Sequence, residues 1–194
     1  MNEHCWVRIL TIVLLNISLS NGFVTVVPII NKMDCKFNAR IINLTCTLNK
    51  PNTFVNQTVS MEMEIMREVK DVKLAAAYYV VSGSGDSSRL VQRTVDLCSY
   101  VRHPNRDRLV KVIFDRLKEE GNYFVTKCPI PRNEKFYIRN LRPTSVQIPG
   151  FIPESSFIFE NIYQIGALFE PVVEVRYYGK LVRVMNKDLQ KPRT

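Results

Sequence analysis

The sequence predicts a mainly β protein, an immunoglobulin-like antiparallel β-sandwich with one α-helix inserted between strands. Most of the chain consists of short segments in which apolar and polar residues alternate, the pattern of a strand with one buried and one wet face. One segment has apolar residues at helical spacing instead. The 194 residues suit a single domain with a substantial core. Many regularly spaced strands and one helix are typical of a sandwich whose sheets turn apolar faces inward.

Five strands are predicted before the helix. The first is β-branched and apolar and is expected to end near Pro28. The third is the clearest, because apolar residues occupy every second position from Val59 to Ile65. The Gly- and Ser-rich residues 82–88 predict a hairpin loop between the fourth and the fifth. The predicted ranges are residues 23–30, 41–48, 58–66, 72–81 and 90–97.

The helix is predicted to follow a cap at Asn105 or Asp107 and to stop at Gly121. Helical spacing divides its residues into two faces, one largely apolar and one charged. The charged face holds Lys111, Asp115 and Lys118, and the apolar face holds Leu109, Val112, Ile113, Arg116 and Leu117.

Strands are predicted again after the helix, over residues 135–140, 156–163 and 172–184. Phe157 and Phe159 share one face of the second of these. Gly179 is expected to mark a turn or a bulge in the third. Residues 148–153 contain two prolines and are predicted to form an edge or a loop.

The first 20 residues are predicted to be a signal peptide. A weakly basic start precedes an apolar run that is too short for a membrane span but suits a signal. Small residues precede a cut after Ser20, and a cut after Gly22 fits nearly as well; the alternative is an uncleaved anchor. We expect a secreted, extracellular domain over residues 21–185, a polar basic tail over residues 186–194 and no later membrane-spanning helix.

Cysteine usage agrees with secretion. Cys5 leaves with the predicted signal, and four cysteines remain, an even number that suits an oxidising compartment. Four cysteines allow three pairings. Of these we expect Cys35–Cys46 and Cys98–Cys128, because each closes a neighbouring segment and the second would hold the helical insert. No metal or cofactor is expected, since Cys-x-x-Cys is absent and one histidine remains after cleavage.

Asn43 and Asn56 each begin an Asn-x-Thr sequon and are predicted glycosylation sites. The formal net charge of +9 would suggest nucleic acid as the partner of a cytosolic protein. In a secreted protein an anionic membrane surface or an acidic glycan is the better partner, and scattered solvated lysine and arginine side chains explain the charge more simply. No nucleic-acid partner is therefore expected.

No catalytic residue is predicted. His103 precedes Pro104 at the start of the helical insert, where a cap or a surface role is expected. Glu62 and Glu64 could act as a carboxylate pair, but they share the wet face of their strand. The apolar pattern is more informative, because methionine and aromatic side chains suit an adaptable pocket as well as a packed core. The candidate ligand-pocket residues are Val59, Met61, Met63, Ile65, Phe157 and Phe159.

Several local features occur together in the order of a known family: Asp34–Asn38, Leu44–Leu48, Val95–Cys98, Cys128-Pro129, Phe136–Asn140 and Ile148-Pro149. Together they resemble a large insect family of small secreted proteins, long labelled a domain of unknown function and similar to the chemosensory B proteins. Both are similar in architecture to ML-type lipid-recognition domains. The resemblance covers about residues 30–165. The strand-linking third disulfide of the lipid-recognition carriers has no counterpart here.

The resemblance implies an ML-like, cup-shaped sandwich that holds a lipid or pheromone-like apolar ligand between its sheets, with a role in insect chemosensation and no catalysis. It carries over no ligand-contact residue, because the matching positions are cysteines and turns. The alternative is an extracellular accessory or interaction protein for a membrane receptor or channel, with no bound ligand. The basic surface and the lack of catalytic groups speak for this alternative.

Overall fold

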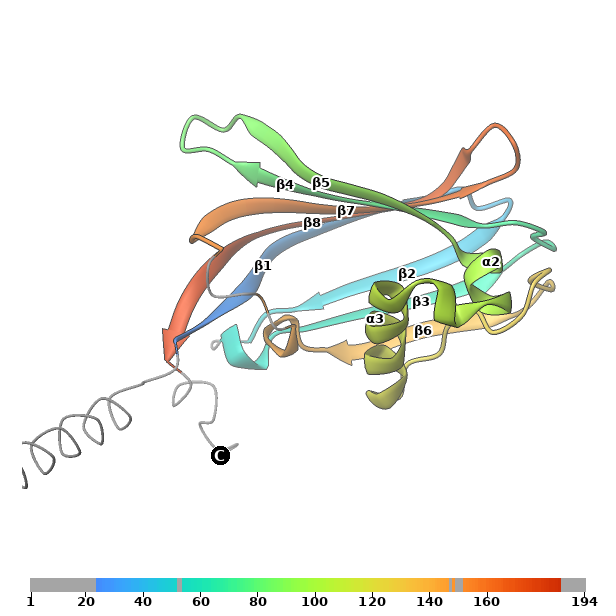
Figure 1. The fold of residues 1–194 in the computed structure, drawn as a ribbon, viewed down its shortest axis with the longest axis horizontal. Helices are drawn as coiled ribbons and strands as arrows, with labels where there is room; N and C mark the ends of the chain where they lie inside the picture. The colour runs from blue at the N-terminus through green and yellow to red at the C-terminus, as the bar shows by residue number, and fades with distance from the viewer. Residues whose placement is uncertain (1–23, 52–53, 147, 149–151, 186–194) are drawn as a thin grey trace, which may run out of the picture.

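Two antiparallel β-sheets face each other in the computed structural model, which describes residues 24–51, 54–146, 148 and 152–185 (Figure 1). The five strands of sheet A are ordered β1-β8-β7-β4-β5, and the three of sheet B are ordered β2-β3-β6. The predicted fold class, a mainly β sandwich, is confirmed. The strands are β1 (Val24–Phe37), β2 (Ile42–Asn49), β3 (Thr58–Ile65), β4 (Lys73–Val81), β5 (Ser87–Asp96), β6 (Lys135–Leu141), β7 (Ser155–Ile165) and β8 (Glu170–Met185).

Each predicted strand coincides with one of these, since the alternation of apolar and polar residues is a local property of the chain. Ile148 forms an isolated bridge to Val26, and three of the other residues predicted as an edge or loop, 149–151, lie outside the described residues. The predicted signal peptide (residues 1–20) and the predicted tail (residues 186–194) also lie outside them.

The first strand does not end near Pro28, as predicted, but continues to Phe37. Pro28 pairs with Leu181 of β8, and β1 is an edge strand of sheet A, where a missing backbone N–H is tolerated. The register of β1 shifts between Ile30 and Lys32. The buried side chain of Gln57 accepts a hydrogen bond from Ile30 N at 2.8 Å and donates one to Ile30 O at 2.6 Å, so both backbone groups of Ile30 are satisfied at the irregularity.

Gly179 lies opposite that irregularity, paired with Ile30, so the predicted bulge is present but the predicted turn is not. A Cβ atom at this position would lie 2.3 Å from the backbone oxygen of Ile29 and 2.8 Å from Cζ of Phe157. Glycine is therefore required by a close approach of β1 to β8 and not by chain reversal.

The insert between β5 and β6 contains two α-helices and not the single one predicted: α2 (Leu97–Arg102) and α3 (Arg108–Glu119). The strand prediction over residues 90–97 ran one residue too far, because Asp96 caps α2 by accepting a hydrogen bond from Ser99 N at 2.7 Å. Asp107 caps α3 through Val110 N at 3.1 Å, as predicted. Gly121 follows α3 with a left-handed φ of 79°, the expected conformation of a helix stop.

The apolar face predicted for the helix is only partly the buried one, since Leu117 is partly buried but its other described apolar members are exposed. Val110 is buried and Phe114 packs on the core, whereas Val112 and Ile113 are 67% and 50% exposed. The side chain of Leu109 lies outside the described part of the structure. Two apolar stripes compete for the core on this helix, and the ring contacts of Phe114 with Tyr100 and Phe124 decide between them, at centroid distances of 4.9 and 5.4 Å.

Disulfide bonds join Cys35 to Cys46 and Cys98 to Cys128, the expected pairing. The first links edge strand β1 of sheet A to edge strand β2 of sheet B. The second links α2, which follows edge strand β5 of sheet A, to the segment that leads into edge strand β6 of sheet B. The two sheets are thus tied at both edges of the sandwich.

Candidate functional site

The interior of the sandwich is closed along β1 and β8 of sheet A and β2 and β3 of sheet B, which we call the closed side. Most of the inward residues there are almost completely removed from solvent. They include Val26, Ile30, Val173, Val175 and Leu181 of sheet A and Ile42, Leu44, Val59, Met61 and Ile65 of sheet B, each at most 6% exposed. Direct packing of this kind is that of an ordinary protein core.

The inner faces of β4 and β7, which we call the open side, remain partly accessible. Leu74, Ala76, Tyr78 and Val80 of β4 share one face with period two, and each is only partly buried. On β7, Phe157 is buried, but the four inner residues that follow it at every second position are only partly buried: Phe159, Asn161, Tyr163 and Ile165. Two strands of sheet A therefore present apolar side chains that sheet B does not fully cover.

Helices α2 and α3 stand at one end of the edge formed by β5 and β6 (Figure 1). Asn122 holds α3 to β6, because its side chain donates to Leu117 O at 2.9 Å and accepts from Arg139 N at 2.8 Å. Toward the other end of β5, Leu90 and Val91 are 61% and 60% exposed. The helices thus cover one end of the open side, and the described residues of the hairpin leave apolar surface at the other.

The six candidate pocket residues all lie between the sheets. Val59, Met61, Ile65 and Phe157 are buried, and Met63 and Phe159 are partly buried. Met61, Met63 and Ile65 belong to a core cluster with Val175, whereas Phe157 and Phe159 belong to a second cluster with Leu181. Among these six, Met63 and Phe159 are the ones that the structure leaves accessible to a ligand.

Tyrosine hydroxyl groups supply polarity inside the sandwich without charge. Tyr177 donates a hydrogen bond to Sδ of Met61 at 3.1 Å. Burial raises the pKa of Tyr163 to about 12, and burial together with the neighbouring Tyr163 raises the pKa of Tyr177 further. Both hydroxyls therefore remain protonated and neutral at any physiological pH.

The carboxylates considered for catalysis are engaged elsewhere. Glu62 pairs with Arg139 at 3.0 Å and Glu64 with Lys135 at 3.8 Å across the wet face of sheet B. His103 ends α2 and is exposed. Within the described residues no group of three or more His, Cys, Asp or Glu side chains is arranged to hold a metal ion. The described part of the chain also has no helix long and apolar enough to cross a membrane.

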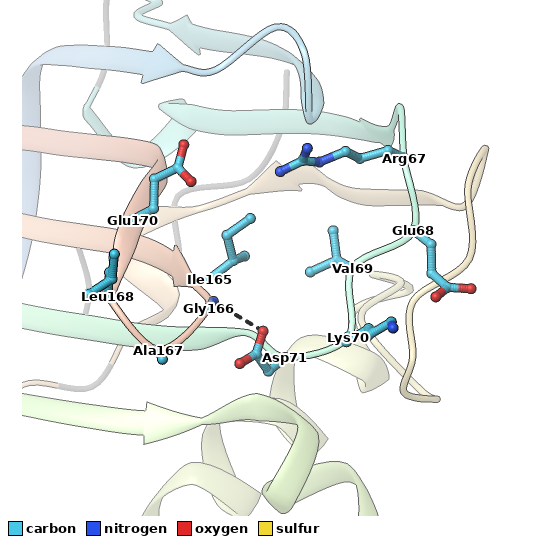
Figure 2. Close-up of a pocket in the computed structure, with 10 residues that line it drawn as sticks. All are labelled: Arg67, Glu68, Val69, Lys70, Asp71, Ile165, Gly166, Ala167, Leu168 and Glu170. Atoms are coloured by element: carbon cyan, nitrogen blue, oxygen red, sulfur yellow. Dashed lines mark hydrogen bonds between the residues drawn. The ribbon is translucent and has the colours of Figure 1, made fainter.

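A separate pocket of about 760 Å³, the end pocket, opens between the β3–β4 connection (residues 67–71) and the β7–β8 turn (residues 165–170) (Figure 2). None of the six candidate residues lines it. Sequence reasoning did not find this pocket, because its two walls are far apart in the chain and meet only through strand pairing. The predicted glycosylation sites lie elsewhere, and both Asn43 and Asn56 are exposed.

Gln57 and Asn122 are two buried polar residues that sequence reasoning also missed. Each makes hydrogen bonds to backbone groups of segments distant in the chain. The sequence offers one weak indication of these buried amides, a single Gln or Asn beside an apolar strand or after a helix. Such a residue is usually exposed on the surface.

Comparison with known proteins gives a family match and a structural likeness. A family model described as "Protein of unknown function (DUF1091)" matches residues 72–159, which run from β4 through α2 and α3 into β7. The fold is similar to that of chicken MD-1 in a crystal structure of its complex with lipid IVa, at 9% sequence identity and a TM-score of 0.37, over 80% of this chain and 96% of that chain. No curated protein sequence matches the chain.

Proposed function

We propose that this chain is a secreted, non-enzymatic protein that binds a hydrophobic ligand between its two sheets, against the inner faces of β4 and β7. The observation that carries the proposal is a difference in burial. All inner positions of β4 and β7 except Phe157 are partly exposed, whereas most inward residues of the closed side are buried. Apolar and aromatic surface that remains accessible inside a rigid fold is typical of small-molecule pockets.

The side chains on the open side indicate the chemistry of the ligand. The accessible surface comes from aliphatic and aromatic residues, with no charged side chain among the inner residues of β4 and β7. Asn161 is the one amide on this face, and no described group forms a hydrogen bond with its side chain. We expect an uncharged apolar ligand, such as a lipid chain or a pheromone-like molecule, with one polar group that reaches Asn161.

The test compares two neighbouring alanines of β4. Ala76 lies on the inner face and Ala75 on the outer face. Ala76→Trp fills the space beside β7 and should abolish binding, whereas Ala75→Trp should leave it unchanged. Native mass spectrometry of the purified glycoprotein, followed by titration with fatty acids, sterols and cuticular hydrocarbons, measures both. Absence of any bound lipid from all these preparations and titrations would overturn the proposal.

The finer part of the proposal is a role in insect chemosensation, which rests on the family resemblance of the cysteine-bearing segments. It predicts that the ligand recovered from the native source is a cuticular hydrocarbon or another volatile or surface signal. Recovery of only membrane phospholipid would contradict this role and leave ligand binding itself intact.

A second candidate function is that of an accessory protein for a membrane receptor, which the outward apolar pair on α3 favours. Val112 is more than half exposed and Ile113 is half exposed. A helix that only covers the sandwich does not need apolar side chains on its outer surface. Val112→Ser with Ile113→Ser should reduce capture of the protein on receptor-bearing cells without affecting ligand binding. Equal capture of the variant and the wild type would count against this function.

A further inference from the structure

We propose that the end pocket is a second binding site, specific for a small amphiphilic carboxylate such as a medium-chain fatty acid. The site goes beyond the proposed function, and the two sites share one residue, Ile165 at the end of β7. The end pocket has a rigid frame, an apolar floor and one charged side chain that extends over it without a partner among the described residues.

The frame of the end pocket is held by backbone hydrogen bonds on every side of the β3–β4 connection. Met66 N donates to Ile41 O at 2.8 Å, and Val69 exchanges two hydrogen bonds with Ile130, at 2.9 and 2.7 Å. Leu97 N donates to Val72 O at 2.9 Å. A connection fixed at its start, middle and end keeps its shape without a ligand, and preformed pockets bind at lower entropic cost.

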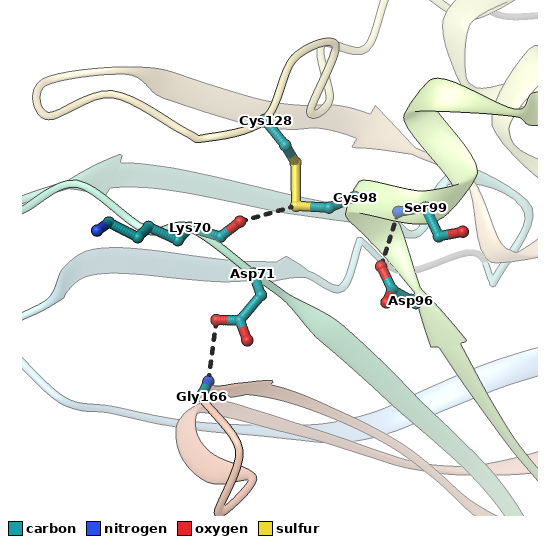
Figure 3. The surroundings of a disulfide bond; sticks show 7 residues. All are labelled: Lys70, Asp71, Asp96, Cys98, Ser99, Cys128 and Gly166. Carbon is teal, nitrogen blue, oxygen red and sulfur yellow. Dashed lines mark hydrogen bonds between the residues drawn. A yellow bond between two sulfur atoms is a disulfide. The ribbon is translucent and has the colours of Figure 1, made fainter.

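The opposite wall is attached to this connection directly. The carboxylate of Asp71 accepts a hydrogen bond from Gly166 N at 3.1 Å, which holds the β7–β8 turn in place (Figures 2 and 3). The Cys98–Cys128 disulfide lies behind Lys70, with the sulfur of Cys98 3.7 Å from the Lys70 carbonyl oxygen (Figure 3). Because a disulfide sulfur carries no proton, this is a packing contact, and it supports the connection from the side away from the pocket.

The floor of the end pocket is apolar. Val69 and Ile165 face each other from the two walls (Figure 2), and Val69 is 3% exposed and packs in the main core cluster with Ile165 at its margin. Leu168, at the tip of the turn, is 94% exposed. An aliphatic chain of a few carbons would contact the floor and cover part of Leu168.

The charges at the rim are not equivalent. Asp71 is engaged with Gly166, and Glu170 accepts a hydrogen bond from the side chain of Asn38 at 3.4 Å. Lys70 and Glu68 point away from the pocket, whereas the guanidinium group of Arg67 extends over it (Figure 2). No described residue forms a hydrogen bond or an ion pair with the Arg67 side chain, so its planar fork of donors is available to a carboxylate.

These features together define the ligand class. A pocket of about 760 Å³ lies within the usual range for small ligands, about 300–1,000 Å³. A cation above an apolar floor selects a molecule with one anionic end and one apolar end. The carboxylate would pair with Arg67 and the chain would lie on Val69 and Ile165.

The experiment is a titration of the full mature protein with octanoate and with octanol, which share a chain and differ in charge, monitored by isothermal calorimetry. Arg67→Gln should weaken octanoate binding about tenfold or more, the effect of losing a charge-assisted hydrogen bond. Lys70→Gln, three residues away with the same change of charge, should change it by less than about twofold, since that side chain points away. Octanol should bind at least about tenfold more weakly than octanoate.

Three results would overturn the proposal. Equal affinity for octanol and octanoate would show that Arg67 contributes no recognition. Equal losses in the Arg67 and Lys70 variants would show that only the net charge of this end matters. Octanoate binding that survives Arg67→Gln and is lost in Ala76→Trp would place the acid between the sheets and sink the end site, while the proposed function would stand.

Discussion

The closed and open sides of this sandwich both turn apolar residues inward, but they bury these residues to different extents. On β3 apolar residues alternate with polar ones, whereas β4 and β7 carry apolar residues on both faces, among them Tyr79 and Ile158 on the outer face. On both sides the inward positions are largely apolar. On the closed side most inward residues are buried, whereas on β4 and β7 all of them except Phe157 remain partly accessible. The residue pattern along a strand therefore determines which side chains point inward, whereas the facing sheet determines how far these side chains are removed from solvent.

Sheet size and connectivity explain where the difference falls. Sheet A has five strands and sheet B has three, so part of sheet A has no facing strand to cover it. The chain passes from β1 directly to β2, and the Cys35–Cys46 disulfide joins these strands, which brings the sheets together at that edge. At the other edge a long insert with α2 and α3 separates β5 from β6 in the chain.

The largest expected effect concerns the disulfide on the open side. Cys98→Ser with Cys128→Ser opens a loop with a sequence separation of 30, and chain entropy assigns such a loop about 3.6 kcal/mol of stability. Cys35→Ser with Cys46→Ser opens a loop with a separation of 11, for which the same relation gives about 2.8 kcal/mol. Urea unfolding of both variants checks the order. A larger loss for the Cys35–Cys46 variant would mean that the closed side depends on its disulfide more than on packing.

The glycines offer the next contrast. Gly179→Ala places a methyl group 2.3 Å from the Ile29 oxygen on the closed side and should cost about 3 kcal/mol. Gly83→Ala, in the β4–β5 hairpin, meets nothing within 4 Å and should change stability by less than about 0.5 kcal/mol. Thermal unfolding by circular dichroism distinguishes them. If both variants were equally stable, the close approach of β1 to β8 would not be a rigid feature.

Two methionines on one face of β3 compare a buried position with a partly exposed one, with the residue type held constant. Met61 is 6% exposed and accepts a hydrogen bond from Tyr177, whereas Met63 is partly buried. Met61→Ala should destabilise the protein by about 2–3 kcal/mol and Met63→Ala by about 1 kcal/mol, because a partly open site leaves a smaller dry cavity. Chemical denaturation gives both values. Reversal of this order would contradict the assignment of Met63 to accessible surface.

The smallest effect is a pH dependence on β7. The ring of Tyr163 is partly exposed, but burial of its hydroxyl raises its pKa from 10.0 to about 12. A pKa that is higher in the folded state contributes stability below the unfolded value, and that stability is lost as the pH rises through the folded value. Stability should therefore fall between pH 10 and about 12, by about 1 kcal/mol at pH 11 for this group.

Unfolding of the wild type and of Tyr163→Phe at pH 9 and pH 11 measures that loss. The variant should lose less stability over this interval than the wild type, and the remaining loss belongs to Tyr177 and other groups. Identical losses in both proteins would mean that water reaches the Tyr163 hydroxyl, and the open side would then extend further along β7 than the structure indicates.

The sequence alone determined the eight strand positions, the cap of α3, its stop at Gly121 and the pairing of cysteines with near neighbours. These features depend on local periodicity, on turn and cap chemistry and on short separations along the chain. The course of β1 through Pro28 and the whole of α2 were missed. The first depends on an edge position beside β8, and the second on the Asp96 cap, which competes with extension of the strand.

Only the tertiary structure decided which side of the sandwich is open, which stripe of α3 is buried and that residues 67–71 meet residues 165–170 in a pocket. Each of these depends on groups distant in the chain that approach one another through pairing of the sheets. Met61 and Met63 stand in the same alternating pattern of the sequence, but the structure covers Met61 more completely than Met63. A strand pattern states which face turns inward, but the distance to the facing surface is set by strands elsewhere in the chain.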